Sequence, residues 1–154
     1  MDEFRIRVVP TPWNKGKLVG QKAPLKPKEI WAVRVRLQIY CRTRELALLD
    51  LGIDSKLRAC DLLKLKVRDL RYGERIAARA IVVQQKTSRP VLFEITEPTR
   101  TALADWIRPA GASENFLFPS PVRASPHLRV RQYARIVDAW VELRENRLTA
   151  VARP

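Results

Sequence analysis

The spacing of apolar residues predicts helices in the first half of the chain. Leu46, Leu49 and Ile53 recur at helical spacing on one face of a segment over residues 42–51, which the next glycine is expected to end. The preceding segment begins at Pro27, a residue suited to the first turn of a helix. Its apolar residues fit helical and strand spacing equally well, so the pattern leaves its conformation open.

A leucine-rich segment follows and predicts a second clear helix. Asp54 and Ser55 are the candidates for its N-cap. Arg58 and Asp61 lie three residues apart in it, which predicts neighbouring positions on one helical face. The apolar residues of this helix are Leu57, Cys60, Leu62, Leu63 and Leu65.

The middle of the chain has the composition of β-strands. Residues 67–70, 76–84 and 90–96 are rich in β-branched or alternating apolar residues. The turn residues Tyr72-Gly73-Glu74 follow the first of them, and the basic segment Lys86-Thr87-Ser88-Arg89 separates the last two. This order predicts a small three-stranded antiparallel sheet with a basic tip.

Two more helices complete a fold that we expect to be α+β and mainly helical. One is predicted from Pro98 to about Ile107, and the other from Ser125-Pro126 to about Leu143. A chain of 154 residues has room for one compact domain. We expect a basic arm rich in proline and glycine over residues 1–27, the folded domain over 28–143 and a divergent tail over 144–154.

The charge of the chain favours a polyanionic partner. The formal net charge is +14, and the positive excess is spread over the folded segments instead of being confined to one tail. Such a surface attracts nucleic acid, although a merely solvated basic surface is the simpler explanation. No apolar run approaches the roughly 18 to 20 residues that span a bilayer, so no membrane partner is expected.

Few residues of the chain are suited to metal or disulfide chemistry. The two cysteines, Cys41 and Cys60, and the single histidine, His127, make neither a disulfide framework nor a zinc site. We expect no metal and no cofactor. The low cysteine content suits a reducing cytosol, which is the expected location.

Three features occur in a meaningful order along the chain. The leucine-rich helix with Arg58 and Asp61 comes first, the basic strand connection with Lys86 comes next, and Phe116-Leu117-Phe118-Pro119 precedes an arginine-rich helix. Together they resemble the catalytic domain of tyrosine recombinases, the phage-integrase family, over residues 28–143. The likeness is greatest to short bacterial integrase-like proteins without the usual N-terminal core-binding domain. It implies DNA recombination and integration, with duplex DNA of the nucleoid as the partner.

The resemblance implies a role for each of three residues. Arg58 matches the first catalytic arginine of the family, Asp61 the acidic residue that helps to orient it, and Lys86 the hairpin lysine that protonates the leaving 5′ oxygen. An arginine fork placed in advance stabilises the charge that develops on two phosphate oxygens. The family attacks with a tyrosine and keeps the bond energy in a phosphotyrosyl link, which requires no nucleotide cofactor. The simpler interpretations are a surface pair of Arg58 with Asp61 and a solvated Lys86.

Other basic residues are candidates for binding the DNA backbone. These are Lys56, Arg89, Arg131 and Arg135, for which solvated surface charge is nearly as good an explanation. The large apolar residues Trp106 and Trp140 are expected in the core.

Part of the family pattern is missing from the sequence. The His-x-x-Arg motif, a second histidine or tryptophan and the terminal tyrosine nucleophile do not follow the last predicted helix. His127 has no arginine three residues on, and Tyr133 is expected to pack inside a helix. We therefore expect a C-terminally truncated recombinase that cannot cleave DNA alone, and that pairs with itself or with a full-length recombinase. Two alternatives stay open: a non-catalytic DNA-binding module, and a small RNA-binding or ribosome-associated protein.

Overall fold

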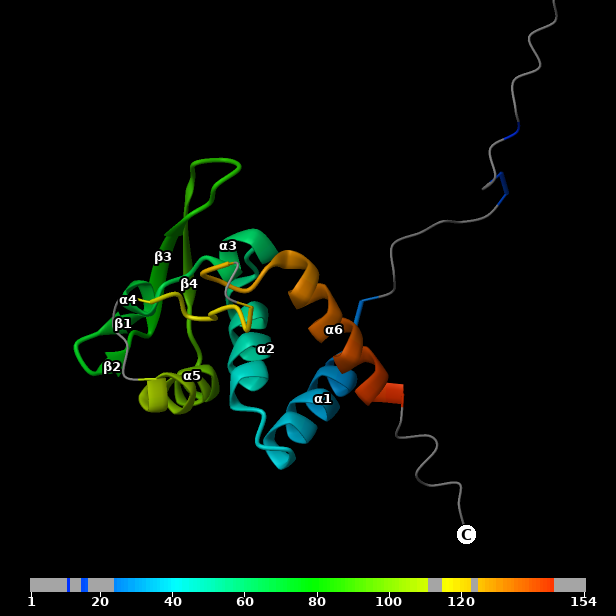
Figure 1. The fold of residues 1–154 in the computed structure, drawn as a ribbon, viewed down its shortest axis with the longest axis horizontal. Coiled ribbons are helices and arrows are strands. Elements are labelled where there is room, and N and C mark those ends of the chain that lie inside the picture. The colour runs from blue at the N-terminus through cyan, green and yellow to red at the C-terminus, as the bar shows by residue number, and fades with distance from the viewer. Residues whose placement is uncertain (1–10, 12–14, 17–23, 111–114, 123–124, 146–154) are drawn as a thin grey trace, which may run out of the picture.

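The computed structural model describes residues 11, 15–16, 24–110, 115–122 and 125–145. The described residues form an α+β fold in which helices predominate (Figure 1). The predicted arm over 1–27 and tail over 144–154 lie largely outside the described residues. In chain order the elements are α1 (Pro27–Ile39), α2 (Thr43–Ser55), α3 (Ala59–Leu63), α4 (Val67–Leu70), β1 (Arg71–Tyr72), β2 (Arg75–Ile76), β3 (Arg79–Val83), β4 (Pro90–Glu94), α5 (Glu97–Ala110) and α6 (Val130–Glu145).

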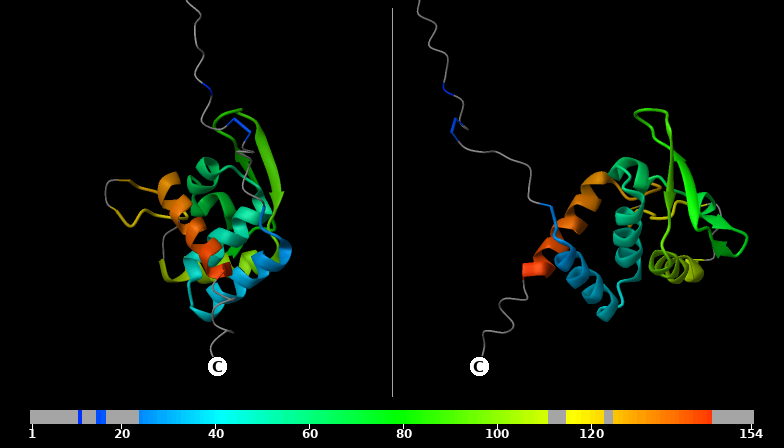
Figure 2. Two further views of the ribbon diagram at one scale, coloured as in Figure 1. Left: turned by 90° about the vertical axis from the view of Figure 1, so that its right-hand side faces the viewer. Right: turned by 180° about the vertical axis from the view of Figure 1, so that it is seen from behind.

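Helix α2 occupies the centre of the molecule. Its residues Ala47, Leu48 and Leu51 are completely buried, and α1 and α5 pack on it. Helix α6 crosses α1 and α3, and the hairpin β3–β4 projects beyond the helices (Figures 1 and 2). In the part of the chain that the structure describes, no helix is both long and apolar enough to cross a membrane.

The segment that begins at Pro27, for which the sequence did not decide between helix and strand, forms helix α1. Val33 and Leu37, four residues apart, are buried on its inner side. The carboxylate of Glu29 accepts the backbone N–H of Lys26 at 2.7 Å, which stabilises the first turn. The outer side is also apolar, since Trp31 is 62% exposed and Ile39 69% exposed. Apolar residues on both sides of the helix explain why the sequence pattern did not distinguish helix from strand.

Helix α2 does not end at Gly52, as the sequence pattern predicted, but continues to Ser55. A Cβ atom on Gly52 would lie 3.5 Å from Leu62 and 3.6 Å from the hydroxyl of Tyr133. Neighbouring segments thus make ordinary packing contact with the helix at Gly52, whose carbonyl accepts the N–H of Lys56 at 3.2 Å.

The predicted N-caps of the leucine-rich helix were wrong. Arg58 is the residue before α3 and has extended backbone angles of φ −65° and ψ 150°. Asp54 instead accepts hydrogen bonds from the N–H and hydroxyl of Thr96, at 2.9 and 2.8 Å. Because Arg58 lies outside the helix, it does not share a helical face with Asp61.

The predicted three-stranded sheet is replaced by two separate two-stranded sheets. Strand β1 pairs with β2, and β3 pairs antiparallel with β4 in a register that places Ile81 opposite Leu92. Residues 67–70, predicted as a strand, form the helical turn α4. The carboxylate of Asp69 accepts the N–H of Lys66 at 2.8 Å and stabilises this turn. A segment of four residues is too short for the spacing of its apolar residues to distinguish a helical turn from a strand.

The last two helices lie close to the predicted positions. Helix α5 begins one residue before Pro98, and α6 begins at Val130, later than the predicted Ser125-Pro126. Ser125 Oγ donates to the carbonyl of His127 at 2.8 Å, so this segment forms a turn. The side chain of Gln132 accepts the N–H of Arg129 at 2.9 Å and supports the helix start there.

Candidate nucleic-acid interface

The connection between α2 and α3 presents two exposed basic side chains. Lys56 ends α2 in the left-handed conformation, with φ at 52°, and Arg58 directly precedes α3. Ser55 Oγ accepts the N–H of Leu57 at 3.3 Å and holds the short connection. The backbone thus displays a lysine and an arginine, two residues apart, at the start of α3.

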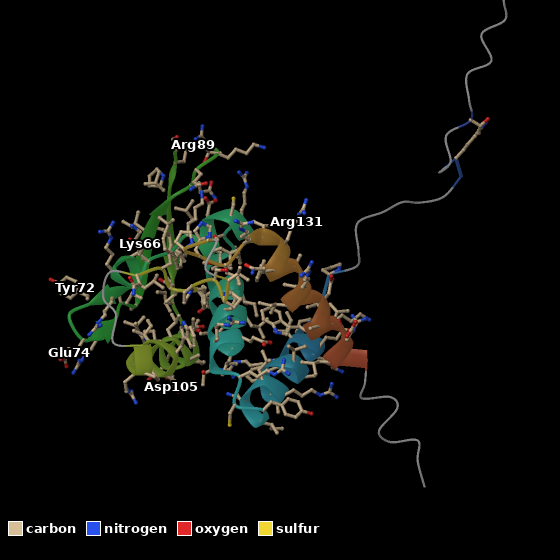
Figure 3. All side chains as sticks on the ribbon, viewed as in Figure 1. Lys66, Tyr72, Glu74, Arg89, Asp105 and Arg131 are labelled. Atoms are coloured by element: carbon tan, nitrogen blue, oxygen red, sulfur yellow. The ribbon has the colours of Figure 1, made fainter. Side chains whose placement is uncertain are left out.

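The tip of the β3–β4 hairpin presents a second basic pair, Lys86 and Arg89. Both side chains are exposed, and Arg89 lies at the far end of the projecting hairpin (Figure 3). The tip is an ordered turn, because the N–H of Ser88 donates to the carbonyl of Gln84 at 2.8 Å and the N–H of Gln84 to that of Arg89 at 3.0 Å. The prediction of a basic tip between these strands is therefore confirmed.

Asp61 connects these two regions. It lies on α3, is only 3% exposed, and its Oδ1 accepts the backbone N–H of Gln85 at 3.1 Å. Lys64, the residue directly after α3, donates from Nζ to Oε1 of Gln85 at 2.8 Å. Gln85 precedes Lys86 in the chain. The sequence analysis did not identify Gln85 or Lys64 as site residues. For Gln85, the only signal in the sequence was its position next to Lys86.

Helix α6 supplies the third basic region. Arg131 and Arg135 are exposed and lie four residues apart, which places them on one helical face. Helix α6 packs on α3, so that α3 lies between the hairpin and α6 in all three views (Figures 1 and 2). Figure 3 shows Arg131 at the end of α6 that faces α3.

The six basic candidates have no acidic partner among the residues that the structure describes. None of them forms an ion pair with any other residue in the described ranges, whereas Arg34, Arg42 and Arg79 do. Unpaired, exposed cations on neighbouring elements produce a positive potential that can bind phosphate groups. The six residues, Lys56, Arg58, Lys86, Arg89, Arg131 and Arg135, are called the basic face below.

The tyrosines are not arranged as nucleophiles beside this face. Tyr133 is half-buried and its ring meets that of Trp140 edge-on, with 6.4 Å between the centroids. Burial raises the pKa of the Tyr133 phenol, which disfavours the phenolate that would attack phosphorus. Tyr72 is exposed at the end of β1, at the opposite end of the molecule from α6 (Figure 3).

The single histidine packs in a loop. The ring of His127 lies 5.0 Å from that of Phe116, and its Nδ1 is 2.9 Å from the carbonyl oxygen of Leu128. The described residues also contain no group of three His, Cys, Asp or Glu side chains that could hold a metal ion.

Comparison with known proteins identifies the fold. No family model and no curated protein matches the sequence. The crystal structure of XerA recombinase is similar, with a TM-score of 0.64 and 16% sequence identity. The match covers 82% of this chain and 44% of that one, so the chain spans less than half of XerA recombinase. At this identity the likeness concerns architecture alone, and the chain has a fold similar to that of XerA recombinase.

Proposed function

We propose that the protein binds duplex DNA through the basic face, as a recombinase-type module that does not cleave or rejoin DNA by itself. The observation that supports this most directly is that Arg58, Lys86 and Arg131 are exposed, form no ion pair with a described residue, and lie next to α3, on the hairpin bonded to α3 and on α6, which contacts α3. The net charge of +14 adds a long-range attraction to the phosphate backbone.

Each region of the face has chemistry suited to phosphate. Arg58 offers a guanidinium fork that can hold two oxygens of one phosphate. Lys86 and Arg89 project on the hairpin and can reach a neighbouring phosphate or a groove edge. Asp61 is buried, so its carboxylate does not contact a phosphate group directly. We infer a backbone-directed interface, in which the shape of the duplex matters more than its sequence.

The missing groups argue against catalysis by this chain alone. Catalytic residues of one site act as a unit, and the loss of some removes nearly all of the rate. The sequence has one histidine, which packs against Phe116, and Tyr133 is half-buried against Trp140. The proposal thus includes Arg58 and Lys86 as phosphate-binding residues of recombinase type. Assembly with a second copy or a longer recombinase, in the cytosol, is part of the same proposal.

Binding can be tested with labelled duplex DNA, single-stranded DNA and a folded RNA of equal length. We expect the duplex to bind most tightly, measured by fluorescence anisotropy at fixed salt. A preference for the folded RNA would contradict the proposal and favour an RNA-binding protein.

Absence of cleavage needs a separate test. A nicked suicide duplex traps covalent protein–DNA intermediates, which denaturing gels detect. We expect no adduct with the purified chain. An adduct that disappears in Tyr133→Phe would show that the half-buried tyrosine attacks DNA, and the non-catalytic part of the proposal would be wrong.

A further inference from the structure

In the part of the chain that the structure describes, Gln85 joins the hairpin tip to the region of α3 by side-chain hydrogen bonds. Its backbone N–H donates to Asp61 Oδ1 at 3.1 Å, and its side-chain oxygen accepts Lys64 Nζ at 2.8 Å. Both contacts come from the neighbourhood of α3, and both hold the residue that precedes Lys86. The position of Lys86 relative to Arg58 therefore depends on Gln85.

Close apolar packing does not hold the tip. An open pocket of about 340 Å³ separates α3 from β3, and its lining includes Asp61, Lys64 and Gln85 as well as apolar residues of β3. Ile81 and Val83 on β3 are 64% and 61% exposed. With so little apolar burial near the tip, the polar contacts to Gln85 carry the attachment.

The use of a buried aspartate for this attachment costs folding free energy. Its Oδ2 is buried and has no hydrogen-bond partner in the described structure. A buried carboxylate with an unsatisfied oxygen destabilises a fold, so such a group calls for an explanation other than stability. Arg58 does not supply the missing partner, since no described side chain donates a hydrogen bond to Oδ2.

We propose that Asp61 is a positioning residue for Lys86: its carboxylate fixes the hairpin tip on α3 so that Lys86 and Arg58 face the same stretch of DNA backbone. This inference rests on the proposed DNA-binding function. It differs from the expectation that Asp61 orients Arg58, because the observed hydrogen bond joins Asp61 to the hairpin.

A double-mutant cycle in duplex affinity tests the coupling. We expect Asp61→Ala and Lys86→Ala each to weaken binding, by about threefold to tenfold, and the double variant to bind no more weakly than Lys86→Ala alone. In the matched cycle with Arg131→Ala the two losses should multiply, since Arg131 lies on α6. Losses that multiply in the Lys86 cycle as well would overturn the proposal, as would an Asp61→Ala variant with unchanged affinity.

Amide hydrogen exchange tests the attachment without DNA, and so separates this inference from the proposed function. In Asp61→Ala the amide of Gln85 should exchange about tenfold faster or more, while Ala80 and Phe93 in the β3–β4 ladder keep their protection. Unchanged exchange at Gln85 would overturn the inference. Unchanged duplex affinity in Lys86→Ala, with faster exchange in Asp61→Ala, would instead contradict only the DNA-binding face.

Two further variants guard against a general loss of structure. Asp61→Asn keeps an acceptor oxygen and should restore both slow exchange at Gln85 and duplex affinity; an Asn variant as impaired as Ala would contradict the hydrogen-bond assignment. Lys64→Met removes an exposed charge at the surface and should also speed exchange at Gln85, because it removes the second contact. No change in Lys64→Met would show that Lys64 plays no part in the attachment and would overturn that element of the proposal.

Discussion

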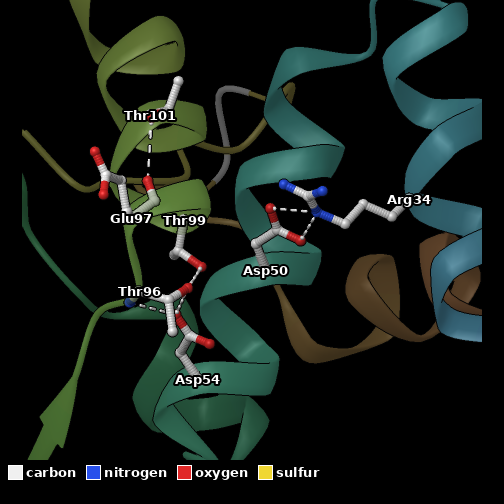
Figure 4. A network of polar contacts seen from close by, with 7 residues as sticks. All are labelled: Arg34, Asp50, Asp54, Thr96, Glu97, Thr99 and Thr101. Carbon is white, nitrogen blue, oxygen red and sulfur yellow. Dashed lines mark hydrogen bonds and ion pairs between the residues drawn. The ribbon is translucent and has the colours of Figure 1, made fainter. Parts of the chain in front are cut away.

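The Nε of Arg34 on α1 lies 3.0 and 3.1 Å from the two carboxylate oxygens of Asp50 on α2 (Figure 4). Asp50 is only 5% exposed, and Arg34 also lies over the ring of Trp31, 5.5 Å from its centroid. Asp54 on the next turn of α2 binds Thr96, which shares a hydrogen bond of 3.0 Å with Thr99. Polar contacts thus extend from α2 to α1 on one side and to the start of α5 on the other.

Removal of Arg34 should therefore strongly destabilise the fold. Arg34→Met leaves the Asp50 carboxylate buried without its cation, which typically costs about 3 to 5 kcal/mol. Urea unfolding should show a lower midpoint in this variant. Arg36→Met, on the same helix but without an ion pair to the described residues, should stay within about 0.5 kcal/mol of the wild type. Equal stability of the two variants would contradict this account.

The same site predicts a pH dependence of stability. Burial raises the pKa of Asp50 above 3.8, and the opposing hydrogen bond and charge of Arg34 do not cancel the effect. The folded state then holds the proton more tightly than the unfolded state. The stability of the wild type relative to Asp50→Asn should consequently fall as the pH rises from about 3.8 through the raised pKa. Urea unfolding of both proteins across this range measures the difference, and a rise with pH would contradict the assignment.

Trp140 should be the tryptophan on which stability depends most. It is 2% exposed, and its Nε1 donates to Glu45 Oε2 on α2 at 2.9 Å. Trp140→Phe removes the donor and leaves a small cavity, at an expected cost of about 2 kcal/mol. Trp31→Phe, at a largely exposed site, is the matched control and should change the unfolding free energy little. The predicted core position of Trp140 is confirmed by its burial, whereas Trp106 is half-buried and donates to the carbonyl of Leu117 at 2.8 Å.

Lys56 offers a way to separate stability from charge. Its left-handed conformation at the end of α2 favours glycine, so Lys56→Gly should stabilise the fold by about 0.5 to 1 kcal/mol. Lys56→Ala removes the same charge but keeps the strained conformation, and should show no such gain. Thermal or urea unfolding distinguishes the two. Both variants should weaken duplex binding equally if Lys56 contacts phosphate.

The basic face predicts a characteristic response to salt. Each phosphate contact adds about 0.9 to the slope of log affinity against log salt concentration. Arg58→Ala and Lys86→Ala should each reduce this slope by about 1. Arg108→Ala removes an equal charge from the last turn of α5, which is remote from the hairpin tip in Figure 1, and should leave the slope unchanged. An equal reduction in all three variants would mean that the charge acts only through the net total.

Local sequence signals determined much of the secondary structure. The spacing of Leu46, Leu49 and Ile53 located α2, proline located the starts of α1 and α5, and the basic segment around Lys86 located the hairpin tip. These features act over a few residues, because proline fixes its own backbone angle and apolar residues recur on one face of a helix. The net charge and the ordered motifs also indicated a recombinase-like fold, which the likeness to XerA recombinase supports at the level of architecture.

Other features depended on contacts between distant segments, which no local pattern reports. Gly52 lies inside α2, where Leu62 and Tyr133 from other segments of the chain contact it. Arg58 and Asp61 looked like a pair on one helix, but Arg58 lies outside α3. The bond between Asp61 and Gln85 crosses 24 residues of sequence. The sequence by itself determined which residues are basic and where α1 and α5 begin. Only the tertiary structure decided which basic residues lie near one another, because burial and hydrogen bonding join residues that are far apart in the chain.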